Sequence, residues 1–268
     1  MKTGIAIGLT LLVGCADNER VEPPAATIDL HTAFGIATDL QPVGLAIAPD
    51  GQRYVFEESR GLYRLDGDHA VPVVSMSSLP SPDKPITLPF TDLVALGPNL
   101  FALTAIGDGF LLDIQQQTLR QHFCYLPGDG GGAPVSLTQR TDAIAYDAER
   151  GLLFAQPITY DAAGTFQYSQ VATYDRTTGA DTEWHQADND VAATGMLALP
   201  DGRLVLGQSS QLTVYDRATD QSTALDDLHR FGVRSIDGLA IDPAAGTLVV
   251  VDKVTDTVFD IDLALLSL

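Results

Sequence analysis

Residues 237–252 read DGLAIDPAAGTLVVVD: a short apolar run, a turn containing proline and glycine, and a second apolar run rich in valine. Two β-rich runs joined by such a turn are typical of a β-hairpin. Four earlier segments have the same arrangement, each with an alanine at the third place of its first run. The five recurrent alanines are Ala46, Ala95, Ala145, Ala198 and Ala240. They are 42 to 53 residues apart, somewhat wider than the usual propeller repeat of about 40 to 45 residues.

A third β-rich run follows each hairpin and ends in an acidic residue. These residues are Asp66, Asp113, Asp175, Asp216 and Asp260. A fourth, less regular run is visible at Val71–Ser75 and Arg120–Phe123, and helical periodicity is almost absent. Short strands grouped in this way predict an all-β fold, a β-propeller spanning residues 28–268. A β-sandwich also has evenly spaced strands and is the alternative.

The repeats also predict the number of blades. Five inner strands are visible, and the last repeat ends close to Leu268. We therefore expect Ala26–His31 to supply the outer strand of the last blade, which closes the ring. A sixth blade within residues 67–90 or 156–170 stays open. The recurrent alanine is expected to fit a crowded inner strand near the axis.

The N-terminal residues have the pattern of an export signal. Lys2 gives a short positive region, and Thr3–Leu12 is apolar but too short to cross a hydrocarbon core of about 30 Å as a helix. Residues 1–14 are thus predicted to be a signal peptide, and residues 15–27, polar and proline-bearing, a flexible tether.

The tetrapeptide Leu12-Val13-Gly14-Cys15 resembles the lipobox of bacterial lipoprotein precursors. The resemblance implies that the Cys15 thiol receives a diacylglyceryl group, that the signal is cut before it, and that the new amine is acylated, for example with palmitate. It implies a cell-envelope location with a membrane anchor. Ala16, where aspartate would favour retention in the inner membrane of enteric bacteria, implies the outer membrane. Cys124 then has no intramolecular partner and is expected to be a buried thiol.

The overall charge limits the partners. The net charge is −20, and lysine occurs only three times. Such a surface repels phosphate backbones, so nucleic-acid binding is disfavoured. It also offers many oxygen ligands for cations such as Ca²⁺, although a solvated acidic surface explains the charge equally well.

One register position of the repeat is rich in carboxylates. The residues three places before the recurrent alanines are Val43, Asp92, Asp142, Gly195 and Asp237. Inner strands of a propeller run in the same sense, so equivalent positions should form a ring at one channel mouth. Close carboxylates raise one another's pKa or recruit a cation. Asp92, Asp142 and Asp237 are therefore candidate metal ligands, and the alternative is that each bonds turn or loop amides.

Residues 40–265 resemble the NHL and SMP-30/gluconolactonase-like propellers, most closely at Asp237–Asp242, Thr247–Asp252 and Val258–Asp260. The resemblance implies a divalent metal in the channel, and Asp237 matches an aspartate of that family. Asp92 and Asp142 stand where the family more often has asparagine, and Val43 stands near the place of a glutamate ligand.

Two functions follow from these residues. The first is an envelope propeller that binds or scaffolds a protein, peptide or glycan partner. The second is a Ca²⁺-dependent lactonase or esterase, whose catalytic residues the sequence does not identify. The incomplete ligand set favours the first.

We predict that Cys15→Ser gives an uncleaved precursor without lipid, because a hydroxyl group does not form the thioether. Metabolic labelling with a fatty-acid probe measures this. Label retained on the serine variant would rule out acylation at Cys15.

Overall fold

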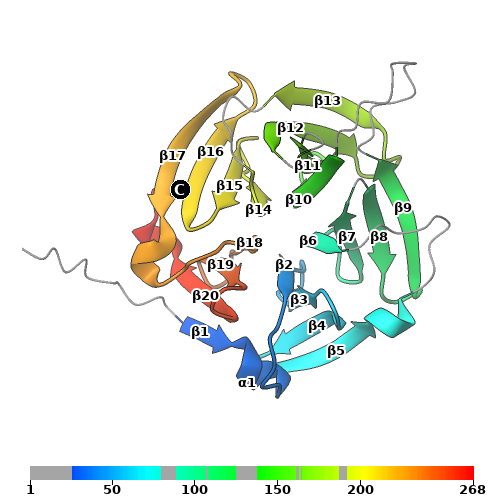
Figure 1. The fold of residues 1–268 in the computed structure, drawn as a ribbon, viewed down its shortest axis with the longest axis vertical. Coiled ribbons are helices and arrows are strands. Elements are labelled where there is room, and N and C mark those ends of the chain that lie inside the picture. Colours follow the sequence, from blue (N-terminus) through cyan, green and yellow to red (C-terminus); the bar gives the residue numbers. More distant parts are fainter. Residues whose placement is uncertain are drawn as a thin grey trace, which may run out of the picture.

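The chain forms a five-bladed β-propeller. The computed structural model describes residues 26–79, 89–106, 108–124, 138–160, 163, 165–186 and 192–268. Within them, five four-stranded antiparallel sheets stand around a central axis (Figure 1). The predicted fold and the count of five blades are confirmed. The predicted signal peptide, Cys15 and the tether up to residue 25 lie outside the described residues.

Each of the first four blades is built from consecutive strands. Blade 1 contains β2 (Pro42–Ile47), β3 (Arg53–Glu57), β4 (Gly61–Asp66) and β5 (His69–Ser75). Blade 2 contains β6 (Phe90–Ala95), β7 (Leu100–Ala105), β8 (Asp108–Asp113) and β9 (Thr118–Cys124). Blade 3 contains β10 (Thr138–Asp147), β11 (Leu152–Tyr160), β12 (Phe166–Asp175) and β13 (Asp181–Gln186). Blade 4 contains β14 (Gly195–Ala198), β15 (Leu204–Gln208), β16 (Gln211–Asp216) and β17 (Gln221–Asp227).

Blade 5 combines the two ends of the described chain. It contains β18 (Gly238–Asp242), β19 (Thr247–Asp252), β20 (Thr257–Asp262) and, as its outer strand, β1 (Ala26–Asp29). The helical segments are short: α1 (Leu30–Phe34), η1 (Met76–Ser78), η2 (Leu228–Phe231) and η3 (Leu263–Leu265). No helix in the described ranges has the length and apolar character needed to cross a bilayer.

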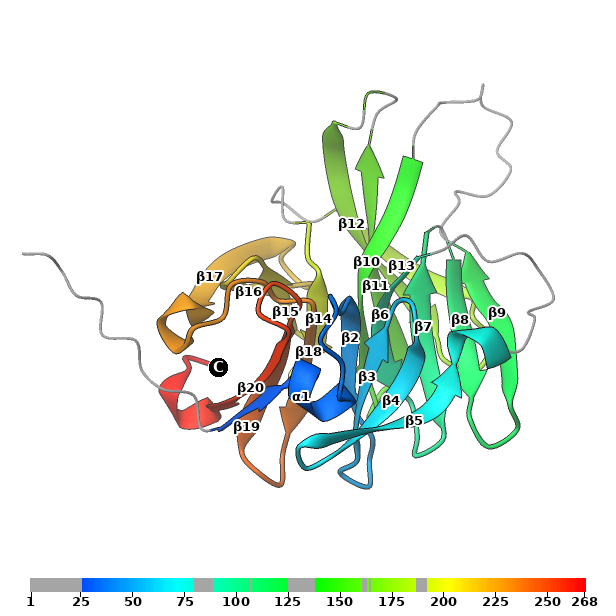
Figure 2. The same cartoon turned by 60° about the horizontal axis from the view of Figure 1, so that its bottom comes forward.

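The described parts of the two segments considered for a sixth blade belong to other blades. Residues 67–90 include β5, the outer strand of blade 1. Residues 156–160 and 166–170 form the ends of β11 and β12, which with β10 are 9 or 10 residues long. Figure 2 shows these three strands rising beyond the ring. The long interval between the third and fourth alanines is therefore an extension of blade 3. Cys124 ends β9, but its side chain is outside the description.

The core lies between blades. Five hydrophobic clusters each combine side chains from two neighbouring blades, in the order 1–2, 2–3, 3–4, 4–5 and 5–1. All six residues of β19 are buried because a neighbouring blade covers each face of the strand. This explains why residues 248–251 are a continuous apolar run and do not alternate with polar residues.

The ring is closed by the start of the described chain, as predicted, but the strand is shorter than the expected Ala26–His31. It ends at Asp29, whose side chain accepts the Thr32 N–H and caps α1, so Leu30 and His31 are helical. β1 pairs antiparallel with β20, and Ala26 lies opposite Asp260. Ala26 and Thr27, which the sequence assigns to the tether, are thus part of the strand. Next in the chain, Leu30 is fully buried and its backbone N–H donates to the Asp256 carbonyl at 2.8 Å.

A partly buried ion pair joins the last blade to the first. Both terminal nitrogens of Arg53, in β3, contact the two carboxylate oxygens of Asp260 at 2.8 Å. Nη2 also lies 2.8 Å from Asp242 Oδ2. These side chains are 19%, 9% and 11% exposed, so solvent weakens the contacts little. Blade 5 is therefore held by backbone pairing to β1 and by charge to blade 1.

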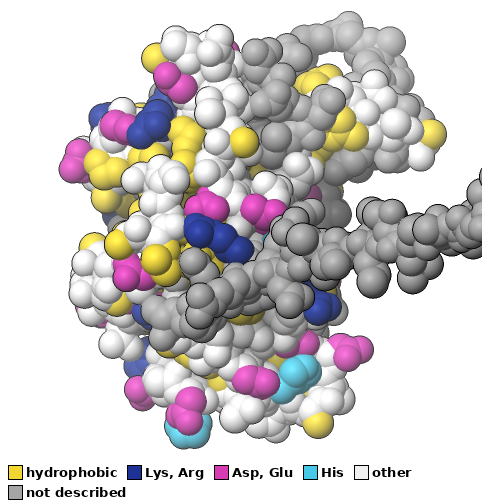
Figure 3. All heavy atoms as spheres, turned by 90° about the vertical axis from the view of Figure 1, so that its left-hand side faces the viewer, with side chains coloured by type: hydrophobic (Ala, Val, Ile, Leu, Met, Phe, Trp, Pro, Cys, Tyr) yellow, Lys and Arg dark blue, Asp and Glu magenta, His cyan; other side chains and the backbone are white. Residues whose placement is uncertain are grey.

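Several aspartates accept hydrogen bonds from the backbone N–H groups of turns. Asp113 Oδ1 accepts hydrogen bonds from the backbone N–H groups of Gln115 and Gln116. Asp175 accepts from Thr177 and Thr178 in the same way, and the Thr178 bond holds the pKa of Asp175 below its ordinary value. These bonds explain the acidic end of the third strand in these blades. On the face carrying β17 and the C-terminus, acidic side chains are spread out and form no single patch (Figure 3).

We predict that removing Ile28–Phe34 lowers the melting temperature strongly, because β20 would become an unpaired edge and Leu30 would leave its cluster. Leu30→Ala alone should reduce the free energy of unfolding by about 2 to 5 kcal/mol. Denaturant titration measures both changes, with exposed Thr32→Ala as the control. An unchanged midpoint in the truncated chain would mean that another segment closes the ring.

Candidate functional site

The inner strands define a channel with two different ends. β2, β6, β10, β14 and β18 surround the axis, each contacting the next. We call the end where these strands begin the entry end, and the end where they finish the exit end. Each inner strand has a sheet partner on one side only, so its other edge faces the axis with backbone groups that need partners.

At the entry end, both carboxylate oxygens of Asp92 are hydrogen-bonded within the protein. It is 2% exposed, and its Oδ1 accepts the backbone N–H of Leu93 at 2.7 Å. Its Oδ2 accepts the N–H of Ile144, in the inner strand of the next blade, at 2.9 Å. Burial raises the pKa of Asp92 well above its ordinary value, and the charges of Asp237 and Asp142 raise it further, whereas the two backbone bonds oppose the rise. The carboxyl group thus satisfies strand edges of blades 2 and 3.

Asp237 is held by a lysine. Lys253 Nζ lies 2.7 Å from Asp237 Oδ1, and the backbone N–H of Lys253 donates to Oδ2 at 3.2 Å. The Asp237 side chain is 4% exposed and that of Lys253 is 41% exposed. An ammonium group from the chain therefore lies against one of the three predicted metal ligands.

The repeat register predicts that Asp92, Asp142 and Asp237 lie at one channel mouth, and all three lie at the entry end. Asp142 and Asp237 line one small cavity of about 60 Å³, together with Val43 and Lys253. Asp92 is close enough for both charges to affect its pKa. Across the described ranges, no three His, Cys, Asp or Glu side chains are arranged to hold a metal ion. The Ca²⁺ assignment to these aspartates stays a prediction.

Further contacts tie the inner strands together at the entry end. The hydroxyl of Thr91 donates to the Thr141 carbonyl of the next blade, and the hydroxyl of Thr194 donates to the Ile236 carbonyl. A Cβ added to Gly44 would lie 2.6 Å from the backbone nitrogen of Leu93, so the strands of blades 1 and 2 meet closely there. Thr91, Thr141 and Thr194 stand directly before Asp92, Asp142 and Gly195. This recurrence in the sequence could have identified them as contacts between inner strands.

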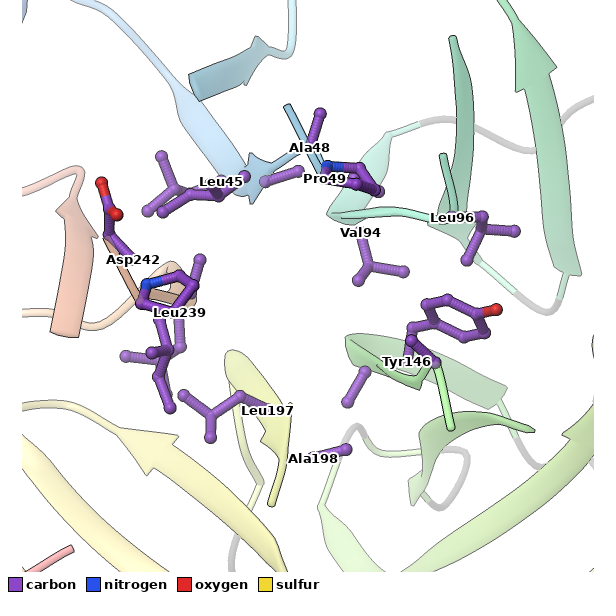
Figure 4. Close-up of a pocket in the computed structure, with 18 of the residues that line it drawn as sticks. Leu45, Ala48, Pro49, Val94, Leu96, Tyr146, Leu197, Ala198, Leu239 and Asp242 are labelled. Atoms are coloured by element: carbon purple, nitrogen blue, oxygen red, sulfur yellow. The ribbon is translucent and has the colours of Figure 1, made fainter. Parts of the chain in front are cut away.

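The large open space lies at the exit end. A cavity of about 700 Å³ is lined by residues of all five inner strands, and all five recurrent alanines are among them. Figure 4 shows Leu45, Val94, Tyr146, Leu197 and Leu239, one from each inner strand, around an open centre. The lining is predominantly aliphatic. The rim is formed by hairpin turns that include Pro49, Asp50, Pro243 and Ala244.

The recurrent alanine therefore has a role that the sequence did not show. Ala46 and Ala145 are 2% and 1% exposed and do pack in a crowded place, as expected. Ala95, Ala198 and Ala240 are only partly buried and border the cavity. A small side chain at this position keeps the exit end of the channel wide.

Few polar side chains reach the exit cavity. Arg176 donates to the Tyr146 hydroxyl at 2.9 Å, and its guanidinium lies 5.5 Å from the centre of the Tyr146 ring. Asp242 bonds Arg53 and the N–H groups of its own turn. Asp50 is exposed on the rim and accepts from the backbone of Gln52. The site has polar groups at its edge and an apolar interior.

Comparisons with known proteins give a likeness of architecture. No family model matches the chain, and no curated protein matches it. A gluconolactonase from Xanthomonas campestris has a TM-score of 0.49 and 12% identity, over 81% of this chain and 70% of that one. An auxiliary nutrient binding protein from Bacteroides thetaiotaomicron has a TM-score of 0.46 and 10% identity, over 85% and 69%.

A third solved structure is the extracellular domain of a putative hybrid two-component system from B. thetaiotaomicron. Its TM-score is 0.45 and its identity 14%, over 80% of this chain and 26% of that one. At these identities and scores, the likenesses carry no argument about activity, and the propeller rests on the chain's own five sheets.

We predict that Asp92→Ala reduces the free energy of unfolding by about 2 to 4 kcal/mol, because two buried backbone N–H groups lose their acceptor. Chemical denaturation measures the change. The matched control is Asp201→Ala, which removes an exposed turn carboxylate bonded to Arg203. A loss no larger than that of the control would contradict the structural role of Asp92.

Proposed function

We propose that the protein is an envelope lipoprotein, anchored through Cys15, whose propeller binds a ligand or a protein partner. One observation carries the proposal: the side chains of Asp92 and Asp237 at the entry end are bonded within the protein, and the open space is an apolar cavity at the opposite end. Concave, mostly apolar sites with polar groups at the edge suit binding.

The entry end supports binding over hydrolysis. A metal-dependent hydrolase of lactones or esters needs several oxygens directed at one cation and an open position for water or substrate. Both oxygens of Asp92 accept backbone N–H groups, and both oxygens of Asp237 contact Lys253. A cation there would have to displace bonds that hold the inner strands and the β19–β20 turn.

The anchor rests on the lipobox-like residues. Cys15 precedes Ala26, the first residue of β1, by eleven positions. A chain of that length spans at most about 40 Å when fully extended. The net charge of −20 disfavours direct contact between the propeller and anionic lipid headgroups. We propose that the acyl chains attach the protein to the outer membrane while the propeller stands off the bilayer.

We predict that the purified protein shows no calcium-dependent turnover of gluconolactone or of a p-nitrophenyl ester. Its melting temperature should be the same in millimolar calcium and in a chelator, because Lys253 already neutralises Asp237. Asp237→Asn is the informative variant and exposed Asp201→Asn the control. Turnover that requires calcium and disappears only in Asp237→Asn would replace the binding function with the hydrolase.

A further inference from the structure

We infer that the exit cavity is a binding site for a small molecule with an apolar body and a neutral or cationic polar group. The inference rests on the proposed binding function and names its ligand class. The cavity lies at the opposite end of the channel from Asp92, Asp142 and Asp237, so the site is separate from the predicted metal ligands.

The size and lining of the cavity fit such a molecule. A volume of about 700 Å³ is within the range of about 300 to 1,000 Å³ that small-molecule sites occupy. Val94 and three of the recurrent alanines, Ala95, Ala198 and Ala240, are partly exposed apolar residues of the lining, and Tyr146 adds an aromatic one; Leu45, Leu197 and Leu239 lie behind them and are at most 6% exposed. An aromatic or branched aliphatic group is the body that these walls would cover.

The recurrent alanine keeps space open at three of the five blades, where Ala95, Ala198 and Ala240 border the cavity. A larger side chain at the recurrent position would fill the channel and remove more apolar surface from water, which is favourable. Each of the five positions nevertheless carries alanine, although neighbouring positions on the same strands carry leucine, isoleucine and valine. The width of the cavity is therefore a property of the sequence and not a gap left by the ring alone.

The polar groups around the cavity determine where a ligand's polar group would lie. The Tyr146 hydroxyl accepts from Arg176 and points away from the open centre (Figure 4). Across the ring, Asp50 is exposed on the rim. The axis-facing edges of the inner strands add backbone N–H and C=O groups. A hydroxyl or an ammonium group at the rim can donate to the Asp50 carboxylate or to a strand-edge C=O group while the apolar body occupies the interior.

The charged residues around the cavity favour neutral and cationic ligands over anionic ones. Among the lining residues, Arg176 is basic and Asp50 and Asp242 are acidic, with Asp242 neutralised by Arg53. Arg176 keeps its positive charge but is partly buried and donates to the Tyr146 hydroxyl, whereas the Asp50 carboxylate is exposed on the rim. The whole-chain charge of −20 adds a field that repels anions. Neutral and cationic ligands are therefore favoured over anionic ones of the same shape.

Three probes with one apolar body test this directly. 1-Naphthalenemethanol, 1-naphthylmethylamine and 1-naphthoate share the naphthalene ring and differ in charge. Titrated into the full-length protein and followed by calorimetry or naphthalene fluorescence, the alcohol and the amine should bind with one site per chain. The carboxylate should bind about tenfold more weakly.

Variants locate the site. Ala240→Leu places a larger side chain in the interior, and Ala244→Trp places an indole at the rim; each should weaken the alcohol and the amine by about tenfold. Ala245→Trp is the matched control, because Ala245 lies in the same exposed turn but does not line the cavity. It should bind like the unchanged protein. Thermal melts confirm folding, and Ala244→Trp carries the test if Ala240→Leu does not fold.

Three results would overturn the inference: no binding of any probe at millimolar concentration, equal affinity for the carboxylate and the amine, or unchanged affinity in Ala244→Trp. Each is distinct from failure of the proposed function. Calcium-dependent turnover would overturn the proposed function and leave probe binding at the exit end unaffected. Absence of probe binding without turnover would overturn only the ligand class and leave a protein partner as the occupant of the propeller.

Discussion

A ring of five sheets is complete only when its last sheet has a full set of strands, and here β1 from the start of the described chain covers the edge of β20. The contacts of blade 5 with blades 4 and 1 depend on this pairing. Because each hydrophobic cluster is shared by two neighbouring blades, a poorly ordered fifth blade would open the clusters on both of its sides. Arg53 of blade 1 reinforces the same junction by binding Asp242 and Asp260 of blade 5. The first and last segments of the chain thus act together as one structural unit.

In the closed ring, the inner strand edges at the axis lack sheet partners, and the residues around those edges differ between the two ends of the channel. Five strand edges converge there, each with backbone groups that have no partner in a sheet. At the entry end, Asp92, Thr91 and Thr194 bond the neighbouring blade, so polar side chains hold the strands close. At the exit end the alanines leave room, and the walls are apolar. Carboxylates near the axis therefore serve the ring, while the opposite end is free to receive another molecule.

The sequence predicted those features that depend on local pattern. Strand, turn and strand around each recurrent alanine gave the five blades, and the early end of the last repeat indicated that Ala26–His31 would complete it. The shared end of Asp92, Asp142 and Asp237 followed from register alone. The ion pair between Lys253 and Asp237 could not be predicted, because the direction of the Lys253 side chain depends on how the turn after β19 folds back over the channel. Residues 156–170 left the blade count open, since a longer hairpin and an extra blade both lengthen the interval.

The exit cavity could not be predicted from the recurrent alanines. A small residue at an inner-strand position is consistent with crowding and with an open space, and the sequence pattern is the same for both. The radius of the ring, set by the number of blades and by how closely their strands approach, decides between them. Ala46 and Ala145 are buried, whereas Ala95, Ala198 and Ala240 border the cavity. One recurrent residue therefore has two surroundings within a single ring.

The pairing of Ala26 with Asp260 has a consequence for biosynthesis. The two residues are 234 positions apart, so the strand that is made first has to wait for the strand that is made almost last. Contacts between such distant positions form slowly, because a long segment must be ordered before they are gained. Until blade 5 is complete, the unpaired edge of β20 and the apolar faces of blades 5 and 1 can contact other chains. Aggregation therefore competes with folding. A newly made chain is thus most vulnerable in the interval between the emergence of β1 and the completion of blade 5, when a chaperone that shields strand edges would raise the yield of closed rings.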